Sequence, residues 1–453
     1  MSESEQQAAK RKRATFGVVF LTIFLDMVGF SVIFPLFPAM LDHYMEQESL
    51  AGGGLLTEFV SALQGLGFKG EIQNENFRFE TVIFGGALGS LYAILQFFFA
   101  PVWGRMSDRI GRRPVLMFTL SGTCLGYGLW VFAGSFWVLV LSRVLGGIAG
   151  GNLSVATASI ADVTTRESRS KGMALVGVAF GLGFIIGPAL GGFASQWPLG
   201  TGGGESTFAL NPFSMAAAIS FGLALLNWLW LTLSFRETLS EEKRGESNKP
   251  RPAIFQLDRI KNEAVSNTCL AYLFYMISFS GMEFTLTFLA VERFSYEPIQ
   301  IAKMFLLIGI TLIFVQGFFV RRFVGTIGEK NMALLGILVG LSAFAMLSFN
   351  GGEIWFYFAL FLMSTGVAFI SPTLTSLTSL FSNEQDQGFH LGVFRSSGSM
   401  ARAVGPLLAG LVYFKYGSSI AYLGGAMFLL VPAWFLLRVP QPETKTEKKI
   451  MQA

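Results

Sequence analysis

One short segment decides the fold of this chain: Gly104-Arg105-Met106-Ser107-Asp108-Arg109-Ile110-Gly111-Arg112-Arg113-Pro114-Val115-Leu116. It places one aspartate and four arginines in a turn that glycines interrupt. The stretches on either side, roughly 81–103 and 115–134, are apolar over the length of about 20 residues that a helix needs to cross a bilayer. A charged turn between two such stretches is typical of a short loop at a membrane surface.

The composition of the whole chain agrees with a membrane protein. It is 52% hydrophobic and only 14% charged, with 47 Phe and 52 Gly, which is far from the average of soluble domains. We predict an all-α membrane protein with twelve transmembrane helices in two six-helix halves. The predicted spans are 15–41, 81–103, 115–134, 136–162, 171–194, 211–235, 266–290, 299–320, 331–349, 354–381, 389–413 and 419–438.

Basic residues predict the orientation, because loops rich in Lys and Arg stay in the cytoplasm. They gather before the first span at Lys10–Arg13, after the second at Arg105–Arg113, in the central loop and at the tail, whereas alternate loops hold few. Both termini are therefore expected in the cytoplasm. The net charge of +4 follows from this pattern and gives no support to nucleic acid as a partner; the lipid bilayer is the expected one.

Two long loops interrupt the regular spacing of the spans. Residues 236–265 are charged and polar and predict a cytoplasmic linker between an N-terminal half, 1–235, and a C-terminal half, 266–453. Residues 42–80 predict a long external loop with an amphipathic piece, Leu55–Leu66. That loop could be a surface helix, a lid or a segment with no function of its own.

The two halves show signs of an internal repeat. Gly187-Pro188 in the fifth span matches Gly405-Pro406 in the eleventh with an offset of 218, and Gln96 matches Gln316 with an offset of 220. Asp26 lies 70 residues before Gln96 and Glu283 lies 33 residues before Gln316, and the difference of 37 is about the excess length of the first external loop. This suggests that Asp26 in the first span and Glu283 in the seventh are equivalent positions.

Several charged residues fall within the predicted spans. A charge deep in a bilayer is costly, so such a residue normally faces a partner or a cavity. Asp26 and Glu283 are candidate proton carriers, because burial favours the neutral form of a carboxylic acid and so allows proton exchange near neutral pH. The alternative is a structural acid tied to a neighbouring helix.

The basic counterparts are Arg143 in the fourth span and Arg395 and Arg402 in the eleventh. Arg395 and Arg402 are seven residues apart and so share one helix face. A guanidinium does not lose its proton, so it must meet a carboxylate, water or an anionic substrate. Arg402 is the better candidate for substrate binding, whereas Arg395 could simply anchor its end of the span.

Polar uncharged residues in the spans complete the candidate site. Gln96, Gln316, Asn152 and Tyr127 could bind a ligand or could equally join helices to one another. We expect no cofactor, metal or enzymatic activity, since the chain has only two histidines, His43 and His390, near the membrane edges. It also lacks a nucleotide-binding Gly-x-x-x-x-Gly-Lys-(Ser/Thr) loop.

The charged turn, with Gly104, Asp108, Arg109, Gly111 and Arg112, resembles the signature loop between the second and third helices of the major facilitator superfamily. The resemblance implies a secondary transporter with its site between two halves. It also implies a latch, in which Asp108 pairs across the interface between the halves and Arg109 and Arg112 complete a charge network.

Other stretches resemble further motifs of that superfamily. Arg143-Val144-Leu145-Gly146-Gly147 is similar to its fourth-span motif, which is tied to proton coupling. The stretch around Gly187 and Pro188 resembles the fifth-span motif of antiporters. The second-half counterpart of the charged turn, Val324–Lys330, has lost the aspartate, so a latch should depend chiefly on the first half.

Within the superfamily the chain resembles the proton-driven tetracycline and drug exporters through Ile160–Thr164 and Phe235–Leu239. The segments Phe279–Thr285 and Phe394–Pro406, with the long first loop, resemble the animal tetracycline-transporter-like family, which is linked to movement of organic anions.

These resemblances imply proton-coupled antiport of small organic compounds, anionic or amphipathic, by alternating access. Symport or facilitated uptake of anions is an alternative, as is export of cationic or zwitterionic drugs or of lysolipids. We expect a monomer, in a bacterial inner membrane.

Overall fold

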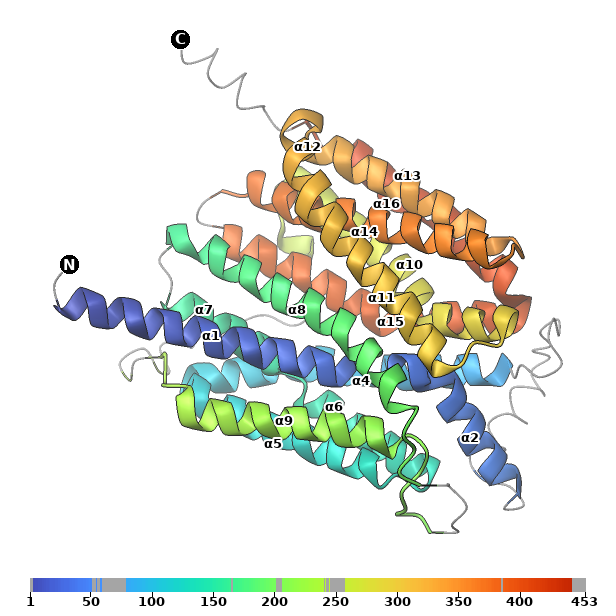
Figure 1. Ribbon diagram of the computed structural model, residues 1–453. Coiled ribbons are helices and arrows are strands. Elements are labelled where there is room, and N and C mark those ends of the chain that lie inside the picture. Colours follow the sequence, from blue (N-terminus) through green and yellow to red (C-terminus); the bar gives the residue numbers. More distant parts are fainter. Residues whose placement is uncertain are drawn as a thin grey trace. The chain divides into compact units, whose positions relative to one another are not determined.

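The computed structural model describes residues 3–50, 54, 58, 79–163, 166–200, 206–239, 241, 244, 257–383 and 386–441, and most of them are helical (Figure 1). Within these residues ten helices are long and apolar enough to cross a membrane. One of them, Phe389–Leu437, contains both of the last two predicted spans, because Gly417 adopts a φ of 80° and kinks the chain between them. Most of the predicted external loop and half of the predicted linker lie outside the described residues.

The elements keep the chain order of Figure 1. They are α1 (Glu3–Ser31), η1 (Phe34–Leu36), α2 (Phe37–Leu50), α4 (Phe79–Ile110), α5 (Arg112–Val131), α6 (Phe136–Ala149), α7 (Asn152–Val163), α8 (Arg166–Ala194), α9 (Ser214–Ser234), η3 (Leu257–Arg259), α10 (Glu263–Phe294), α11 (Pro298–Phe314), η4 (Val315–Val320), α12 (Arg321–Ile327), α13 (Glu329–Ser348), α14 (Glu353–Leu380), α15 (Gln387–Phe428) and α16 (Leu430–Leu437). The segment η4 is π-helical.

The helices group into two compact units. Unit 1 contains 1–52, 91–252 and 296–306, and unit 2 contains 53–90, 253–295 and 307–453. The first part of α4 therefore packs within unit 2, and the first part of α11 packs within unit 1.

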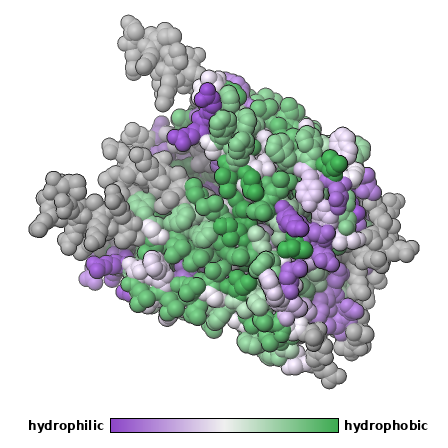
Figure 2. All heavy atoms as spheres, in the orientation of Figure 1, coloured by the Kyte–Doolittle hydropathy of each residue, from purple (hydrophilic) through white to green (hydrophobic). Residues whose placement is uncertain are grey.

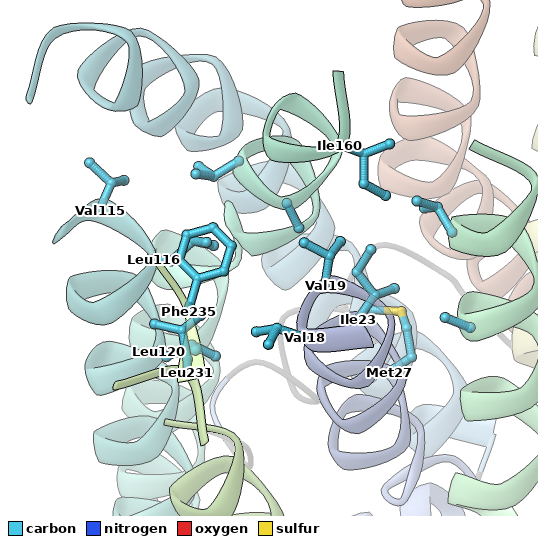
Figure 3. Close-up of a cluster of buried hydrophobic side chains, with 14 residues drawn as sticks. Val18, Val19, Ile23, Met27, Val115, Leu116, Leu120, Ile160, Leu231 and Phe235 are labelled. Atoms are coloured by element: carbon cyan, nitrogen blue, oxygen red, sulfur yellow. The ribbon is translucent and has the colours of Figure 1, made fainter. Parts of the chain in front are cut away.

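The core of unit 1 is a cluster of buried aliphatic side chains next to the charged turn. Val18, Val19 and Ile23 of α1 meet Val115 and Leu116 of α5 there (Figure 3). Residues of α7, α8 and α9 complete the cluster. Because Val115 and Leu116 directly follow the arginines of the turn, this packing fixes the point at which the turn enters α5.

Large apolar side chains are also exposed on the molecular surface. Leu233 is 84% exposed and Ile354 is 85% exposed, and Figure 2 shows hydrophobic side chains covering much of the visible face. Exposed apolar surface on this scale is expected where a protein contacts lipid.

One predicted span is broken in the structure. The sequence predicts a single helix over 136–162, but α6 ends at Ala149 and α7 begins at Asn152. Two side chains of α4 bind carbonyl groups at the break: Gln96 Nε2 donates to Gly150 O at 2.8 Å and Trp103 Nε1 to Ile148 O at 2.6 Å. Kinks of this kind arise where side chains intervene in the backbone hydrogen bonding of a helix.

The internal repeat is visible in two helix pairs, α1 with α8 and α10 with α15. Ser31 Oγ donates to Gly183 O at 3.1 Å, and Ser280 Oγ donates to Ala401 O at 3.2 Å. A Cβ on Gly187 would lie 2.6 Å from Val28 O, just as one on Gly405 would lie 2.6 Å from Ile277 O.

These matched contacts confirm the offset of 218 between α8 and α15, since 405 − 187 = 218 and 401 − 183 = 218. For α1 and α10 they give an offset of 249, since 280 − 31 = 249 and 277 − 28 = 249. The suggested equivalence of Asp26 and Glu283 is therefore wrong. Asp26 corresponds to Tyr275, and Glu283 lies eight residues further along α10, about 12 Å at the helical rise.

The suggested pairing of Gln96 with Gln316 is also wrong. A Cβ on Gly192 would meet Pro298 O and Ile299 Cα, and one on Gly410 would meet Val82 O and Ile83 Cα. The offset between α4 and α11 is thus 216, which places Leu312 opposite Gln96. Two glutamines four residues out of register are too little evidence to fix an alignment.

Candidate functional site

Asp26 lies in the last two turns of α1 in unit 1, where the side-chain amide of Asn152 meets its carboxylate. Asn152 Nδ2 donates to Asp26 Oδ1 at 3.3 Å and to Thr123 Oγ1 at 3.5 Å. Asn152 is 1% exposed, and it is the first residue of α7 after the break at Gly150. The break in the fourth span therefore presents this amide to the acid of the first.

Arg143 of α6 is surrounded by aromatic side chains. It is buried, its guanidinium carbon lies 4.7 Å from the centroid of the Trp130 ring and 5.8 Å from that of Tyr127, and Nε donates to Ser142 Oγ at 3.2 Å. Tyr92 and Tyr127 interact electrostatically with both Arg143 and Asp26. The side chains of Tyr92 and Tyr127 thus lie near both the candidate proton carrier, Asp26, and the buried arginine of unit 1, Arg143.

The charged group of unit 2 consists of Glu283 on α10 and Arg402 on α15. Both side chains are partly buried, and they are close enough for their charges to interact. Arg402 also acts on Tyr272, whose ring stacks on Phe394 with centroids 3.9 Å apart. A Cβ on Gly398 would lie 2.6 Å from Tyr272 Cε1, so this glycine allows the tyrosine to approach α15.

The remaining predicted ligand residues lie elsewhere. Arg395 is exposed, although its charge also acts on Tyr272. Gln316 is exposed on the π-helical segment η4, and Gln96 binds the carbonyl of Gly150. Gln96 thus has the helix-joining contact that the sequence left open.

The charged turn forms a compact network inside unit 1. Arg112 Nη1 donates to Asp108 Oδ1 at 2.6 Å and to Ser107 Oγ at 2.6 Å, and Nε donates to Asp162 Oδ2 at 2.9 Å. Thr238 Oγ1 donates to the same oxygen of Asp162 at 3.1 Å. Arg109, which the sequence places in the same network, is exposed.

Glu237 holds the turn from the segment that follows α9. Its Oε1 accepts from Arg112 N at 2.9 Å and its Oε2 from Arg113 N at 3.1 Å, while Oε1 also accepts from the N–H groups of Thr238 and Leu239. The N–H groups of Arg112 and Arg113 are at the start of α5, where backbone donors have no intrahelical partners. Gly111 precedes them with a φ of 108°, and a Cβ there would collide with the Glu237 carboxylate.

Glycines of the other motif positions serve close packing. Gly104 leaves room for Ser154, whose Oγ would be 3.1 Å from a Cβ at residue 104. Gly187 precedes Pro188 inside α8 and lies directly against α1, where a Cβ would also collide with Ser31 Oγ.

Two acidic residues of the described structure were not identified from the sequence as site residues. Glu237 lies within the stretch Phe235–Leu239, which resembles the exporters. The feature of the sequence that could have identified it is its position directly after an apolar span. Glu292 is 3% exposed and accepts from Ser418 Oγ at 3.0 Å and from the Tyr413 hydroxyl. Its signal was an acid in the last turn of a long apolar helix.

Within the described residues no group of three or more His, Cys, Asp and Glu side chains is placed to hold a metal ion. The chemistry available at Asp26, Arg143, Glu283 and Arg402 is proton exchange and attraction of charge.

Comparison with known proteins identifies a family. The model of the Major Facilitator Superfamily matches residues 19–395 and, in a second match, 326–452. Major facilitator superfamily domain-containing protein 10 of Mus musculus is 32% identical, covering 96% of this chain and 95% of the relative. The tetracycline resistance protein, class E, of Escherichia coli is 30% identical, covering 88% of each.

A solved structure agrees with these matches. The crystal structure described as the human organic anion transporter MFSD10 (TETRAN) has 30% sequence identity and a TM-score of 0.72, covering 94% of this chain and 99% of the other. The resemblance of the sequence to this superfamily, to tetracycline exporters and to the animal tetracycline-transporter-like family is confirmed.

Proposed function

Because the chain belongs to the Major Facilitator Superfamily, and is thus a multi-pass membrane transporter rather than an enzyme, we propose that it transports small amphipathic organic anions together with protons, by symport rather than by the antiport that the sequence resemblances imply. The relatives are named for organic anions and for tetracycline resistance. The observation that carries the proposal is the interaction of Glu283 with Arg402 in unit 2.

Arg402 attracts the anion, and Glu283 carries the proton. In the empty protein the positive charge of Arg402 favours ionised Glu283, because an opposite charge nearby stabilises the charged form of a carboxylic acid. When an anionic substrate binds Arg402, that stabilisation weakens and Glu283 takes up a proton. Anion and proton each break the same ion pair, so binding of one favours binding of the other. This is the requirement for symport, whereas antiport would require that the two exclude each other.

Unit 1 supplies a second acidic residue, Asp26, and a second basic residue, Arg143. Tyr92 and Tyr127 lie near both Asp26 and Arg143. In the proposal Asp26 exchanges protons while Arg143, fixed by Trp130 and Ser142, keeps a positive charge inside the unit.

Movement follows from the repeat. We propose that the N-terminal half, 1–235, and the C-terminal half, 266–453, rock about a central cavity, with 236–265 as linker and with both termini in the cytoplasm. The network of Asp108, Arg112 and Asp162 would stiffen the cytoplasmic end of the first half and support closure there. A monomer suffices for this cycle. Relatives from mouse and from Escherichia coli do not distinguish a bacterial inner membrane from an animal one.

A binding experiment tests the substrate class. Thermal shifts of the purified protein should be measured with organic anions, organic cations and lysolipids. Anions should stabilise the wild type and fail to stabilise Arg402→Ala, whereas Lys415→Ala, an exposed cation on the same helix, should behave as wild type. Stabilisation by cations that is lost in Glu283→Gln would overturn the anion assignment and support export of cationic drugs. Stabilisation by lysolipids alone would overturn it as well.

A further inference from the structure

Two hydrogen bonds join α1 and α9 inside unit 1. Asn227 Nδ2 donates to Thr22 O at 3.2 Å, and Ser220 Oγ donates to Gly29 O at 3.2 Å. The contacts are seven residues apart on each helix, since 29 − 22 = 7 and 227 − 220 = 7, and they follow in opposite order. The two helices are therefore antiparallel and share one register along this seam.

Asp26 lies next to the seam. Residues three and four positions apart are neighbours on a helix surface, and Asp26 is four positions after Thr22 and three before Gly29. In the helix, the carbonyl group of Thr22 also accepts the backbone N–H of Asp26. Thr22 and Gly29 are buried, whereas Asp26 is partly exposed. One side of the acid is thus accessible, and the other adjoins buried polar groups.

Three of these polar atoms have no hydrogen-bond partner among the residues that the structure describes. They are Thr22 Oγ1, Asn227 Oδ1 and Asn152 Oδ1, the last belonging to the amide that binds Asp26. The three residues are at most 1% exposed. A buried polar group without a partner is costly, and proteins commonly satisfy such groups with an ordered water molecule.

The hydroxyl group of Thr22 differs from those of other buried threonines in helices. Thr119 Oγ1 donates to Val115 O at 2.9 Å, and Thr268 Oγ1 donates to Ala264 O at 2.7 Å. Each thus bonds to the carbonyl group four residues earlier, which is the usual local partner of a threonine within a helix. Thr22 Oγ1 makes no such bond, so its hydroxyl group is available to another partner in the seam.

Apolar side chains close the seam at one end. The same register places Val18 beside Leu231, one helical turn beyond Thr22 and Asn227. Val18 is 3% exposed and Leu231 is 0% exposed, and both belong to the buried cluster of Figure 3. Water does not enter a site without polar partners. A water molecule at Thr22 and Asn227 is therefore confined between this cluster and Asp26, and it does not form part of a continuous channel.

We propose that Thr22 and Asn227 bind an internal water molecule that donates a hydrogen bond to the carboxylate of Asp26. The inference rests on the proposed function, in which Asp26 exchanges protons. The water accepts from the Thr22 hydroxyl group and donates one hydrogen to Asn227 Oδ1 and the other to Asp26. These three bonds are the usual number for a buried water.

The water acts when Asp26 loses its proton. The proton leaves through the accessible side of the carboxyl group, and the hydrogen bond from the water stabilises the negative charge that remains. Neither Thr22 nor Asn227 gains or loses a proton. Both are positioning residues, because they act on Asp26 through the water that they hold.

The titratable groups around Asp26 lie on other helices. Those that act on it electrostatically are Tyr92 of α4 and Cys124 and Tyr127 of α5, and Arg143 of α6 acts on both tyrosines. The acid of α7, Asp162, is bound to Arg112. Neither α9 nor the described side chains of α8 include a titratable group, and α1 has none besides Asp26 from residue 14 to residue 31. Substitutions at Thr22 and Asn227 therefore remove no charge near Asp26.

Infrared difference spectroscopy of the full chain in lipid nanodiscs tests the water directly. The carboxyl band of Asp26 is the one that disappears in Asp26→Asn, and water bands are those that shift in water labelled with heavy oxygen. The wild type should show a water band that changes as Asp26 ionises. Thr22→Val and Asn227→Leu should each lose this band. Asp26 should then ionise at a pH about one unit higher or more, because loss of a hydrogen bond to a charged group shifts the equilibrium by roughly 10-fold or more.

Two further variants serve as controls. Thr22→Ser keeps the hydroxyl group and should retain both the water band and the ionisation of the wild type. Thr268→Val removes an equally buried hydroxyl group that α10 itself satisfies, and it should change neither. Because Thr22 and Asn227 lie on different helices, the test does not depend on the folding of a single variant.

The inference is overturned if no water band of the wild type responds to ionisation of Asp26. It is equally overturned if Asp26 ionises at the same pH in Thr22→Val as in the wild type, or if Thr268→Val shifts it as much. Uptake by wild-type proteoliposomes that ignored a proton gradient would contradict the proposed function and leave the infrared result standing. If Asp26→Asn removed no carboxyl band that titrates, both proposals would be contradicted.

Discussion

The carboxylate of Glu237 accepts a hydrogen bond from the backbone N–H of Arg112 at 2.9 Å, although the two residues are 125 positions apart in the chain. The same carboxylate accepts from Arg113 N at 3.1 Å. The segment after α9 therefore completes the start of α5 and sets the direction in which Arg112 leaves the turn.

Removing this carboxylate should destabilise the protein. Glu237→Ala leaves two N–H groups at the start of α5 without acceptors, and hydrogen bonds to a charged group contribute about 1.5–3 kcal/mol. We expect the free energy of unfolding to fall by about that amount in denaturant titrations. Glu237→Gln, which keeps one acceptor, should lose less. Glu241→Ala removes a carboxylate that is 89% exposed and should have almost no effect; an equal loss in both alanine variants would contradict the capping role.

Alanine substitutions of the arginines in the charged turn should differ sharply in their effect on the free energy of unfolding. Arg112 lies between Asp108 and Asp162 with little exposure, and removing one partner of a buried ion pair costs about 3–5 kcal/mol. Arg112→Ala should therefore lower the unfolding free energy strongly, whereas the exposed Arg109→Ala should change it by less than about 0.5 kcal/mol. Thermal unfolding of both variants checks this difference. A large loss of stability in Arg109→Ala would show that the network extends beyond Arg112.

Glycines of α8 should respond according to what they touch. Gly187→Ala places a methyl group 2.6 Å from Val28 O, and such overpacking typically costs about 1–3 kcal/mol. Gly181→Ala, in the same helix, meets nothing within 4 Å and should be neutral or stabilising. The repeat adds a further expectation, because Gly405→Ala should be as destabilising as Gly187→Ala. A tolerant Gly405 would contradict the equivalence of the two helix pairs.

Glu292 should be needed for the stability of unit 2. Its side chain binds Tyr413 and Ser418, which lie on either side of the kink at Gly417. Glu292→Ala leaves both hydroxyl groups without this acceptor, so the melting temperature should fall. The exposed Glu297→Ala is the control. An unchanged melting temperature for Glu292→Ala would show that the kink is held by other contacts.

The sequence predicts those features that depend on local composition. Apolar length locates the spans, and the charged turn at Asp108 and Arg112 is identifiable because such a combination is rare next to a span. The repeat of Gly187 and Gly405 was also predictable, since only glycine permits the close helix contact that both positions make. In each case the physical requirement acts on a few neighbouring residues.

Features that depend on contacts between residues far apart in the chain could not be predicted from the sequence. At the break near Gly150, two carbonyl groups accept hydrogen bonds from Gln96 and Trp103 of another helix. The residues around Gly150 do not predict those partners. The spacing to the two glutamines suggests that Asp26 and Glu283 are equivalent, yet the register of α10 follows from the contact of Ser280 with Ala401 O. Thr22 and Asn227 became candidates only through the packing of α1 on α9.

The central claim is transport of an anion together with protons through Glu283, and gradient-driven uptake into proteoliposomes tests it most directly. The substrate should be an aryl sulfonate that the binding screen has identified, because its charge is permanent and it does not cross lipid as a neutral acid. With an acidic exterior, inward proton flow should drive accumulation in the wild type, and an acidic interior should not. Glu283→Gln should still exchange labelled for unlabelled substrate but should lose accumulation under the gradient. Accumulation in Glu283→Gln equal to that of the wild type, or wild-type accumulation only with an acidic interior, would contradict the account.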